Sequence, residues 1–301
     1  MDTIRSLHYF VRAVELGSLS AVARAEGTTQ PTISKAIAAL ERRVGARLLE
    51  RTTTHLAPTA EGRRFHERAR GLLAEFDAAM TEARGGGAAL CGLLRVSAPV
   101  ALGQLRLNVL VLEFLALHPG IELELILNDR MVDLVEEGVD VAVRLGGDLP
   151  PDMVARKVAV STLLLVAAPA YLERHVPLEM PAQLAQHDYV RFAWLPAGDA
   201  IALHDGTRGV TVTARSRYRV NHALAIRDSL VLGAGIGLCP EWLVGDLLAA
   251  GTLQRVLPGW HGTAQEVHLL ARRHRSARAR AFMEFIGARL AALPGLHAPV
   301  P

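Results

Sequence analysis

The stretch from residue 18 to residue 45 constrains this chain most, because its apolar residues recur at helical spacing on both sides of a short turn. A first short helix is predicted up to Gly27, with its inner face formed by Leu19, Val22 and Ala23. A second helix begins at residues 29–31, and steps of four, three and four separate its inward residues Ile33, Ile37, Leu40 and Val44. Two helices, a glycine-containing turn and a polar start to the second helix are typical of a helix-turn-helix.

The flanking sequence completes a small domain around this motif. Apolar residues at helical spacing predict a helix over residues 2–16 that ends at Gly17. Residues 47–51 and 55–58 read as two short strands around three threonines, which predicts a modest wing. We therefore expect residues 1–58 to form a winged helix-turn-helix domain that binds DNA.

The sequence of residues 59–87 predicts a long linker helix followed by a hinge. Thr59 fits an N-cap, and the helix would run to about Arg84, roughly 40 Å at 1.5 Å per residue. Its apolar residues follow heptad spacing, which favours a dimerisation seam: Phe65, Ala69, Leu72, Phe76, Ala79 and Ala83. The alternative is that this face packs on the C-terminal part of the same chain. Three glycines at 85–87 would form the hinge.

From residue 88 to residue 301 strands and helices alternate, which predicts a parallel α/β sheet. We expect strands near 93–97, 121–127, 139–143, 162–168, 236–239 and 266–271, and helices near 100–117, 130–137, 223–232, 241–249 and 276–290. The expected architecture has two lobes joined by crossing strands, with the last helix returning to the first lobe. Lobe one would comprise about 88–161 and 267–292, and lobe two about 162–266. Residues 175–220 are rich in proline and are not placed.

Charge is distributed unevenly along the chain. Residues 1–70 hold 12 Lys and Arg against 7 Asp and Glu, a net +5, so the remaining residues carry −2 of the total +3. A basic N-terminal part suits a polyanionic partner. The two cysteines form no disulfide or zinc pattern, and neither a signal peptide nor an apolar run of membrane-spanning length is recognised. We expect a cytoplasmic protein with no membrane partner.

The sequence lacks the patterns that would indicate catalysis or a cofactor. Gly233–Gly237 lies between a helix and a strand, the wrong order for a dinucleotide-binding loop. The histidines show no metal-ligand spacing, and nothing places His187, Asp188 and Ser97 together as a triad. No enzymatic activity, metal or cofactor is expected. The basic run at 272–280 could contact nucleic acid, although a solvated start of the last helix is the simpler interpretation.

Two sets of residues carry the expected chemistry. The second helix of the motif should present polar side chains that suit base edges and phosphates, with Gln able to pair with adenine and Lys with guanine. In the α/β part, residues 97–99 lie where a strand passes into a helix, a common ligand position in such sheets. The hydroxyl of Ser97 and the helix amides would suit a carboxylate or another small anion, although a simple helix cap is the alternative.

Several runs resemble the LysR-type transcriptional regulators. The N-terminal run extends from Phe10 through residues 17–20, 30–34 and 40–41 to Gly62. Residues 94–99, 133–144 and 233–240 resemble the effector domain of that family. The resemblance implies a two-lobed effector domain like periplasmic binding proteins, assembly as dimers of dimers, binding to interrupted palindromes near promoters, and an effector that changes DNA bending and the recruitment of RNA polymerase. The sequence departs from the family pattern at Glu26, Thr28 and His55.

With this resemblance, we expect two groups of site residues. The DNA-binding residues are Ser20, Thr29, Gln30, Pro31, Thr32, Ser34, Lys35, Arg42, Arg43, Arg51 and His55. The effector-binding residues are Ser97, Pro99, Val100, Phe192, Trp194, Asn221 and His222, with Arg191 also considered. For Arg42, Arg43 and Arg51 an ion pair with Glu41 or Glu50 is the alternative.

The leading hypothesis is therefore a ligand-responsive, sequence-specific regulator of transcription. Its partners would be double-stranded DNA, further copies of itself as a homodimer or homotetramer, RNA polymerase and a small-molecule effector. The alternative is a two-lobed cytoplasmic small-molecule-binding protein or enzyme with an appended helical domain.

Overall fold

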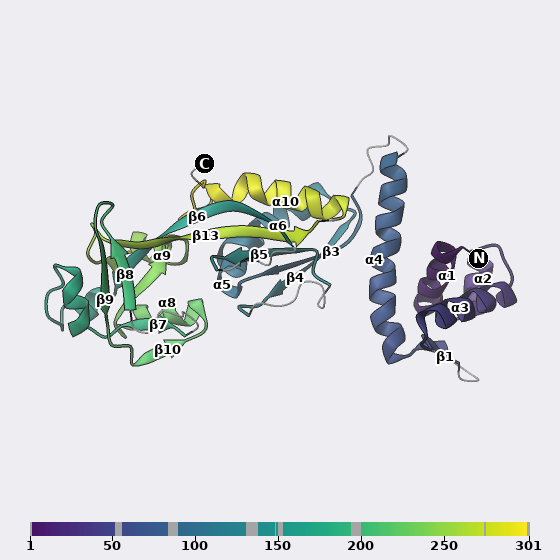
Figure 1. The fold of residues 1–301 in the computed structure, drawn as a ribbon, viewed down its shortest axis with the longest axis horizontal. Helices are drawn as coiled ribbons and strands as arrows, with labels where there is room; N and C mark the ends of the chain where they lie inside the picture. The colour runs from purple at the N-terminus through teal and green to yellow at the C-terminus, as the bar shows by residue number, and fades with distance from the viewer. Residues whose placement is uncertain are drawn as a thin grey trace. The chain divides into compact units, whose positions relative to one another are not determined.

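The computed structural model describes residues 2–51, 56–83, 90–130, 138–147, 149, 153–193, 200–273 and 275–299. It divides the chain into two compact units. One unit comprises Met1–Leu93 with Gly120–Glu122, and the other comprises Leu94–Pro119 with Leu123–Pro301 (Figure 1). The expected hinge at Gly85–Gly87 and nearly all of the expected helix at 130–137 lie outside the described residues.

The first unit begins with the expected winged helix-turn-helix. Its elements are α1 (Thr3–Leu16), α2 (Leu19–Ala25), α3 (Gln30–Val44), β1 (Leu49–Arg51) and β2 (Leu56–Pro58). The two strands pair antiparallel, with Leu49 opposite Pro58, so the wing is present. The inward residues expected from helical spacing, among them Phe10, Ile33 and Ile37, form one buried core. The periodicity therefore predicted the buried faces correctly except at Val44, the last residue of α3, which was expected inward and is 41% exposed.

The helix α4 (Ala60–Ala83) is the expected linker helix, and Thr59 is its N-cap. The Thr59 hydroxyl accepts a hydrogen bond from the Gly62 amide at 2.9 Å and donates one to the Arg47 carbonyl at 2.8 Å. The seam differs in part from the expectation. Phe65 and Ala69 pack against the core of the DNA-binding domain, with the Phe65 ring 5.6 Å from that of Phe10. These first two seam positions are therefore occupied within the chain.

The exposed apolar residues of α4 lie further along the helix. Leu72, Phe76 and Met80 are 52%, 41% and 41% exposed. They follow one another at steps of four residues, so they share one face. An apolar face of α4 is therefore exposed beyond the first three turns of the helix.

The second unit is built on a mixed sheet rather than a purely parallel one. Its main path runs β11-β6-β13-β5-β3-β4, from β11 (Ile236–Pro240), β6 (Met153–Ala167), β13 (His261–Arg272), β5 (Val141–Leu145), β3 (Gly92–Ala98) and β4 (Ile121–Leu127). β3 and β5 pair parallel, as expected, but β13 pairs antiparallel with β5 and β6, and β6 antiparallel with β11. The prediction of a parallel sheet was wrong for these long strands, because alternating elements do not reveal strand direction.

β6 and β13 are the crossing strands that join the lobes (Figure 1). At one end β13 pairs Ala271 with Val141 of β5, and at the other β6 pairs Ala167 with Ile236 of β11. Both strands are longer than expected. β6 begins at Met153 rather than near residue 162, and β13 begins at His261 rather than near residue 266. The charged pair Arg156-Lys157 obscured the start of β6, and Lys157 forms an ion pair with Glu266 of β13 at 3.0 Å.

The remaining elements belong mostly to lobe two. They are α7 (Pro169–Leu172), η2 (Pro181–Gln186), β7 (Val190–Phe192), β8 (Ala200–His204), β9 (Gly209–Thr213), β10 (Tyr218–Val220), α8 (Ala223–Val231), α9 (Glu241–Ala249), β12 (Gln254–Arg255), α10 (Ala277–Arg289) and η3 (Leu290–Ala292). The described part of the unplaced stretch 175–220, without residues 194–199, thus contains four short strands and a 3-10 helix.

One helical stretch corrects the expectation about membrane-spanning segments. Residues Val100–Leu117 form α5 (Val100–Leu102), the π-helical turn η1 (Gly103–Leu107) and α6 (Asn108–Leu117) without a break. By length and composition this helix is long and apolar enough to cross a membrane. Packing explains only one face of it: Phe114 lies 5.1 Å from Phe282 and 5.4 Å from Phe285 of α10, measured between ring centres, whereas Val109, Leu112 and Leu117 are exposed. The last helix thus returns to lobe one, as expected.

Candidate DNA interface and effector site

The recognition helix α3 separates its polar and apolar faces cleanly. The expected DNA-binding residues Thr29, Gln30, Pro31, Thr32 and Lys35 are exposed, whereas the core residues between them are buried. Arg42 is exposed on the same face as Lys35, two turns further along. Ser34 is half-buried, and Ser20 is exposed at the start of α2. Most of the expected set is therefore accessible, as a contact with DNA requires.

The start of α3 differs from the starts of its two neighbours. Asp2 caps α1 through a bond from the Ile4 amide, and Ser18 caps α2 through a bond from the Ala21 amide. The N-cap side chain of α3, Thr29, makes no bond to a helix amide, and its hydroxyl lies 2.8 Å from that of Thr32. The first amides of α3 therefore remain available to a phosphate, which the positive end of a helix favours.

The basic residues at the end of α3 have different surroundings. Arg43 donates a hydrogen bond to the hydroxyl of Thr3, which ties α3 to α1. Among the described side chains Glu41 forms no ion pair with Arg42 or Arg43, the alternative that the sequence left open. One of its carboxylate oxygens accepts hydrogen bonds from the amides of Leu48 and Leu49, at 2.9 and 3.1 Å. The side chain of Arg51 and all of His55 lie outside the described residues.

In lobe one, Ser97 lies beside a buried arginine that the sequence analysis did not single out. Ser97 is fully buried near the end of β3, and Arg144 of β5 is 9% exposed. Both terminal guanidinium nitrogens of Arg144 lie 3.3 Å from the Ser97 hydroxyl oxygen, and one also donates to the Val143 carbonyl at 2.9 Å. A guanidinium stays charged, so this contact places a buried positive charge at the expected anion position.

The neighbouring strand adds a buried histidine to this face of the sheet. The antiparallel register places His268 of β13 opposite Arg144, so both side chains leave the sheet on the same face. Burial lowers the pKa of His268, and its Nε2 lies 3.3 Å from a carboxylate oxygen of Glu266. Its Nδ1 is buried without a hydrogen-bond partner among the described residues.

The expected helix amides next to Ser97 are in part already bonded. Pro99 and Val100 are both half-buried at the start of α5. The Val100 amide donates to a carboxylate oxygen of Asp129 at 3.0 Å, so this amide is occupied by the chain itself. The helix start therefore offers fewer amides to an anion than the sequence suggested, and Arg144 adds a cationic donor beside Ser97.

In lobe two, three of the expected effector residues come together at the ends of two paired strands. β7 and β10 run parallel with Phe192 opposite Val220, and Asn221 and His222 follow directly as the approach to α8. Phe192 and His222 are half-buried and Asn221 is exposed. The considered Arg191 is 5% exposed. Trp194 lies outside the described residues.

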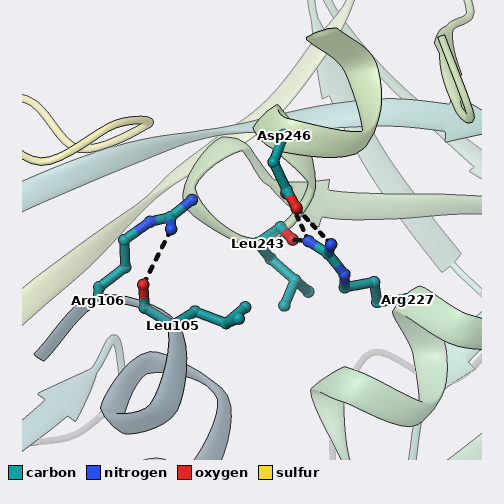
Figure 2. A network of polar contacts seen from close by, with 5 residues as sticks. All are labelled: Leu105, Arg106, Arg227, Leu243 and Asp246. Carbon is teal, nitrogen blue, oxygen red and sulfur yellow. Dashed lines mark hydrogen bonds and ion pairs between the residues drawn. The ribbon is translucent and has the colours of Figure 1, made fainter. Parts of the chain in front are cut away.

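The two groups lie on elements that meet, because α5 of lobe one contacts α8 of lobe two. Figure 2 shows a polar network nearby: Arg227 of α8 donates to the Leu243 carbonyl and to both carboxylate oxygens of Asp246 on α9. Its hydrogen bonds to Asp246 lower the pKa of that carboxyl. Arg106 of lobe one is near the same groups. Burial lowers the pKa of its guanidinium, Asp246 raises it and Arg227 lowers it, with a net lowering. Charged groups of both lobes thus lie beside their boundary.

Comparisons with known proteins agree with this geometry. Residues 4–63 match the family model described as bacterial regulatory helix-turn-helix protein, lysR family, and residues 87–291 match the LysR substrate binding domain. The uncharacterized HTH-type transcriptional regulator YhjC of Escherichia coli is 32% identical over 293 residues, which cover 95% of this chain and 97% of that protein.

Two solved structures of full-length regulators are also similar. The virulence activator AphB of Vibrio cholerae is 26% identical with a TM-score of 0.60, over 96% of this chain and all of that chain. CrgA of Neisseria meningitidis is 26% identical with a TM-score of 0.62, over 95% of this chain and 98% of that chain. With both domain models matched, this chain belongs to the family of LysR-type transcriptional regulators, and is a DNA-binding regulator rather than an enzyme.

Proposed function

We propose that this regulator reads its operator with the exposed face of α3 and responds to a small organic anion at the boundary between the lobes of its effector domain. The observation that carries the proposal is the buried guanidinium of Arg144 beside the Ser97 hydroxyl. A buried charge is costly unless a partner compensates for it, and a carboxylate can accept two parallel bonds from a guanidinium. A carboxylate bound here would add a charged acceptor to the Ser97 hydroxyl and the Val143 carbonyl that Arg144 already contacts.

The opposite lobe suggests what the rest of the effector is like. Phe192, Asn221 and His222 offer one aromatic surface and two polar groups at the ends of β7 and β10. A ligand held by both sets would favour one arrangement of the lobes. A signal passes only if the ligand binds the two arrangements with different affinities. We propose a small carboxylate of which the remainder is planar or apolar.

A thermal-shift screen of small organic acids on the full-length protein tests this proposal. A binding acid should raise the unfolding temperature by about 3 °C or more at saturation. Arg144→Met should abolish that shift, because the charge is lost while most of the volume is kept. Arg208→Met, in the exposed turn between β8 and β9, should preserve it. A hit that stabilises the Arg144 variant as strongly as the parent would refute the role of Arg144.

The base-reading role of α3 is tested at Lys35. Lys35→Ala should weaken operator binding by about 1–3 kcal/mol, roughly tenfold or more, and alter base preference at one position of each half-site. Gel-shift titrations with the promoter beside the protein's own gene, at fixed salt, measure both effects. Arg208→Ala is the matched loss of a positive charge elsewhere. Unchanged affinity and unchanged preference in Lys35→Ala would remove Lys35 from the interface.

Further partners follow from the same fold. We propose that Leu72, Phe76 and Met80 of α4 contribute to a homodimer or homotetramer that binds double-stranded DNA, since this face is apolar and exposed. We also propose, on the family resemblance, a cytoplasmic location and contact with RNA polymerase at the promoter.

A further inference from the structure

The basic run at residues 272–280 is not explained by either expected function. It carries Arg272, Arg273, Arg275, Arg278 and Arg280, without an acidic residue among them. The run connects the end of β13 to the start of α10 (Figure 1). A solvated helix end, the simpler interpretation, would leave all these side chains in water. The structure shows otherwise for two of them.

Arg278 is the buried member of the run. It is only 5% exposed, and its Nε is buried without a hydrogen-bond partner among the described residues. The Nε of Arg275, a half-buried residue, is likewise buried without a hydrogen-bond partner among the described residues. Arginine remains protonated in proteins, so Arg278 cannot relieve this by losing its proton. A buried N–H donor without an acceptor is costly, so two such Nε atoms among the described residues point to a missing acceptor such as an anion.

The helix itself adds to the positive potential at this point. α10 spans 13 residues from Ala277 to Arg289, and Ser276 caps it by accepting a bond from the Ala279 amide. Helix starts favour acidic residues, yet the first turns of α10 carry Arg278 and Arg280 and no acid. Long side chains on a helix point back towards its N-terminus, so Arg278 extends towards the same positive end. Local charges that oppose the helix dipole in this way are typical of a binding site.

The position is separate from the effector site. Arg272 of β13 lies one residue beyond the pair Ala271–Val141, at the amino end of β5. Arg144 lies towards the carboxyl end of β5, about 13 Å further along the strand at 3.3 Å per residue. The run therefore begins past the opposite end of β5 from Arg144.

We infer that the start of α10 is a second anion site, which takes a small phosphate-type oxyanion between Arg275 and Arg278. The depth of Arg278 restricts access to a group of a few atoms, and the planar guanidinium forks match phosphate oxygens. The exposed Arg272, Arg273 and Arg280 attract such anions to the entrance. The group can be free inorganic phosphate or the phosphate of a small monoester, because both present the same oxygens.

Calorimetric and thermal titrations of the full-length protein test the site, with inorganic phosphate and glycerol 3-phosphate as separate probes. Each is compared with chloride at matched ionic strength. We expect saturable binding and a rise of about 3 °C or more in the unfolding temperature. Arg278→Leu should lose both, and its unfolding temperature without phosphate should equal or exceed that of the parent, since a buried donor without an acceptor has been removed. The tighter of the two probes identifies the source of the phosphate.

Control variants separate the site from general salt effects, because phosphate also stabilises proteins by exclusion from their surface. Arg208→Leu, in the exposed turn between β8 and β9, should keep the phosphate response of the parent. Arg275→Gln, at a more exposed position, should weaken binding at least fivefold even if Arg278→Leu folds poorly. An equal response in the parent and in both Arg275 and Arg278 variants overturns the proposal. If the Arg275 and Arg278 variants lose operator affinity and the parent shows no phosphate response, the proposal is also overturned. That outcome would assign the run to nucleic-acid binding.

Discussion

Gly62→Ala is expected to destabilise the DNA-binding domain by roughly 3 kcal/mol or more, through a clash that no side chain can relieve. A Cβ at this position would lie 1.9 Å from the Leu48 carbonyl oxygen and 2.8 Å from its carbon. The same carbonyl accepts a hydrogen bond from the Thr59 amide at 3.0 Å. Because the obstacle is backbone, α4 must move away from the wing, and the cap at Thr59 is strained with it.

Hydrogen exchange on the full-length protein measures this effect locally. Amides of α1 and α3 should lose protection in Gly62→Ala, while those of the effector domain keep theirs. Gly71→Ala is the matched control in the same helix, because its Cβ would meet nothing within 4 Å. Alanine should stabilise α4 there by about 0.5–1 kcal/mol. If the two variants behave alike, close packing of α4 on Leu48 is not what requires glycine at 62.

The features that the sequence predicted well depend on residues near one another in the chain. The first helix was expected over 2–16 and is Thr3–Leu16, and the long helix was expected from a cap at Thr59. Capping and helical periodicity act over three or four residues, so they can be read from one sequence. The exposed face of α3 followed from the same periodicity.

The features that the sequence missed depend on contacts between distant residues. Arg144 and Ser97 are 47 residues apart and meet only because β3 and β5 pair. An arginine within the otherwise apolar run of β5 was the one available signal. In α4 the heptad spacing predicted an apolar face, and its first two positions, Phe65 and Ala69, pack against the DNA-binding core of their own chain. Spacing defines a face and leaves its partner undetermined.

The second large effect is expected at Glu41, where one carboxylate oxygen holds the amides of Leu48 and Leu49. Glu41→Ala leaves two partly buried donors without an acceptor, at about 1–3 kcal/mol each. We expect lower protection of α3 and β1 amides in hydrogen exchange. Operator affinity should also fall about tenfold in gel-shift titrations, because the recognition helix and the wing are no longer held in one geometry.

Glu41→Gln distinguishes an acceptor from a charge at this position. The glutamine carbonyl can accept the same two bonds, although without the added strength of an ionised acceptor. We therefore expect it to retain most of the stability and operator affinity that the alanine variant loses. If Glu41 instead acted as an ion-pair partner of Arg42, glutamine would be as damaging as alanine, and Arg42→Ala would reproduce the loss of α3 protection. A full rescue by glutamine would show that this residue positions the wing through its hydrogen bonds.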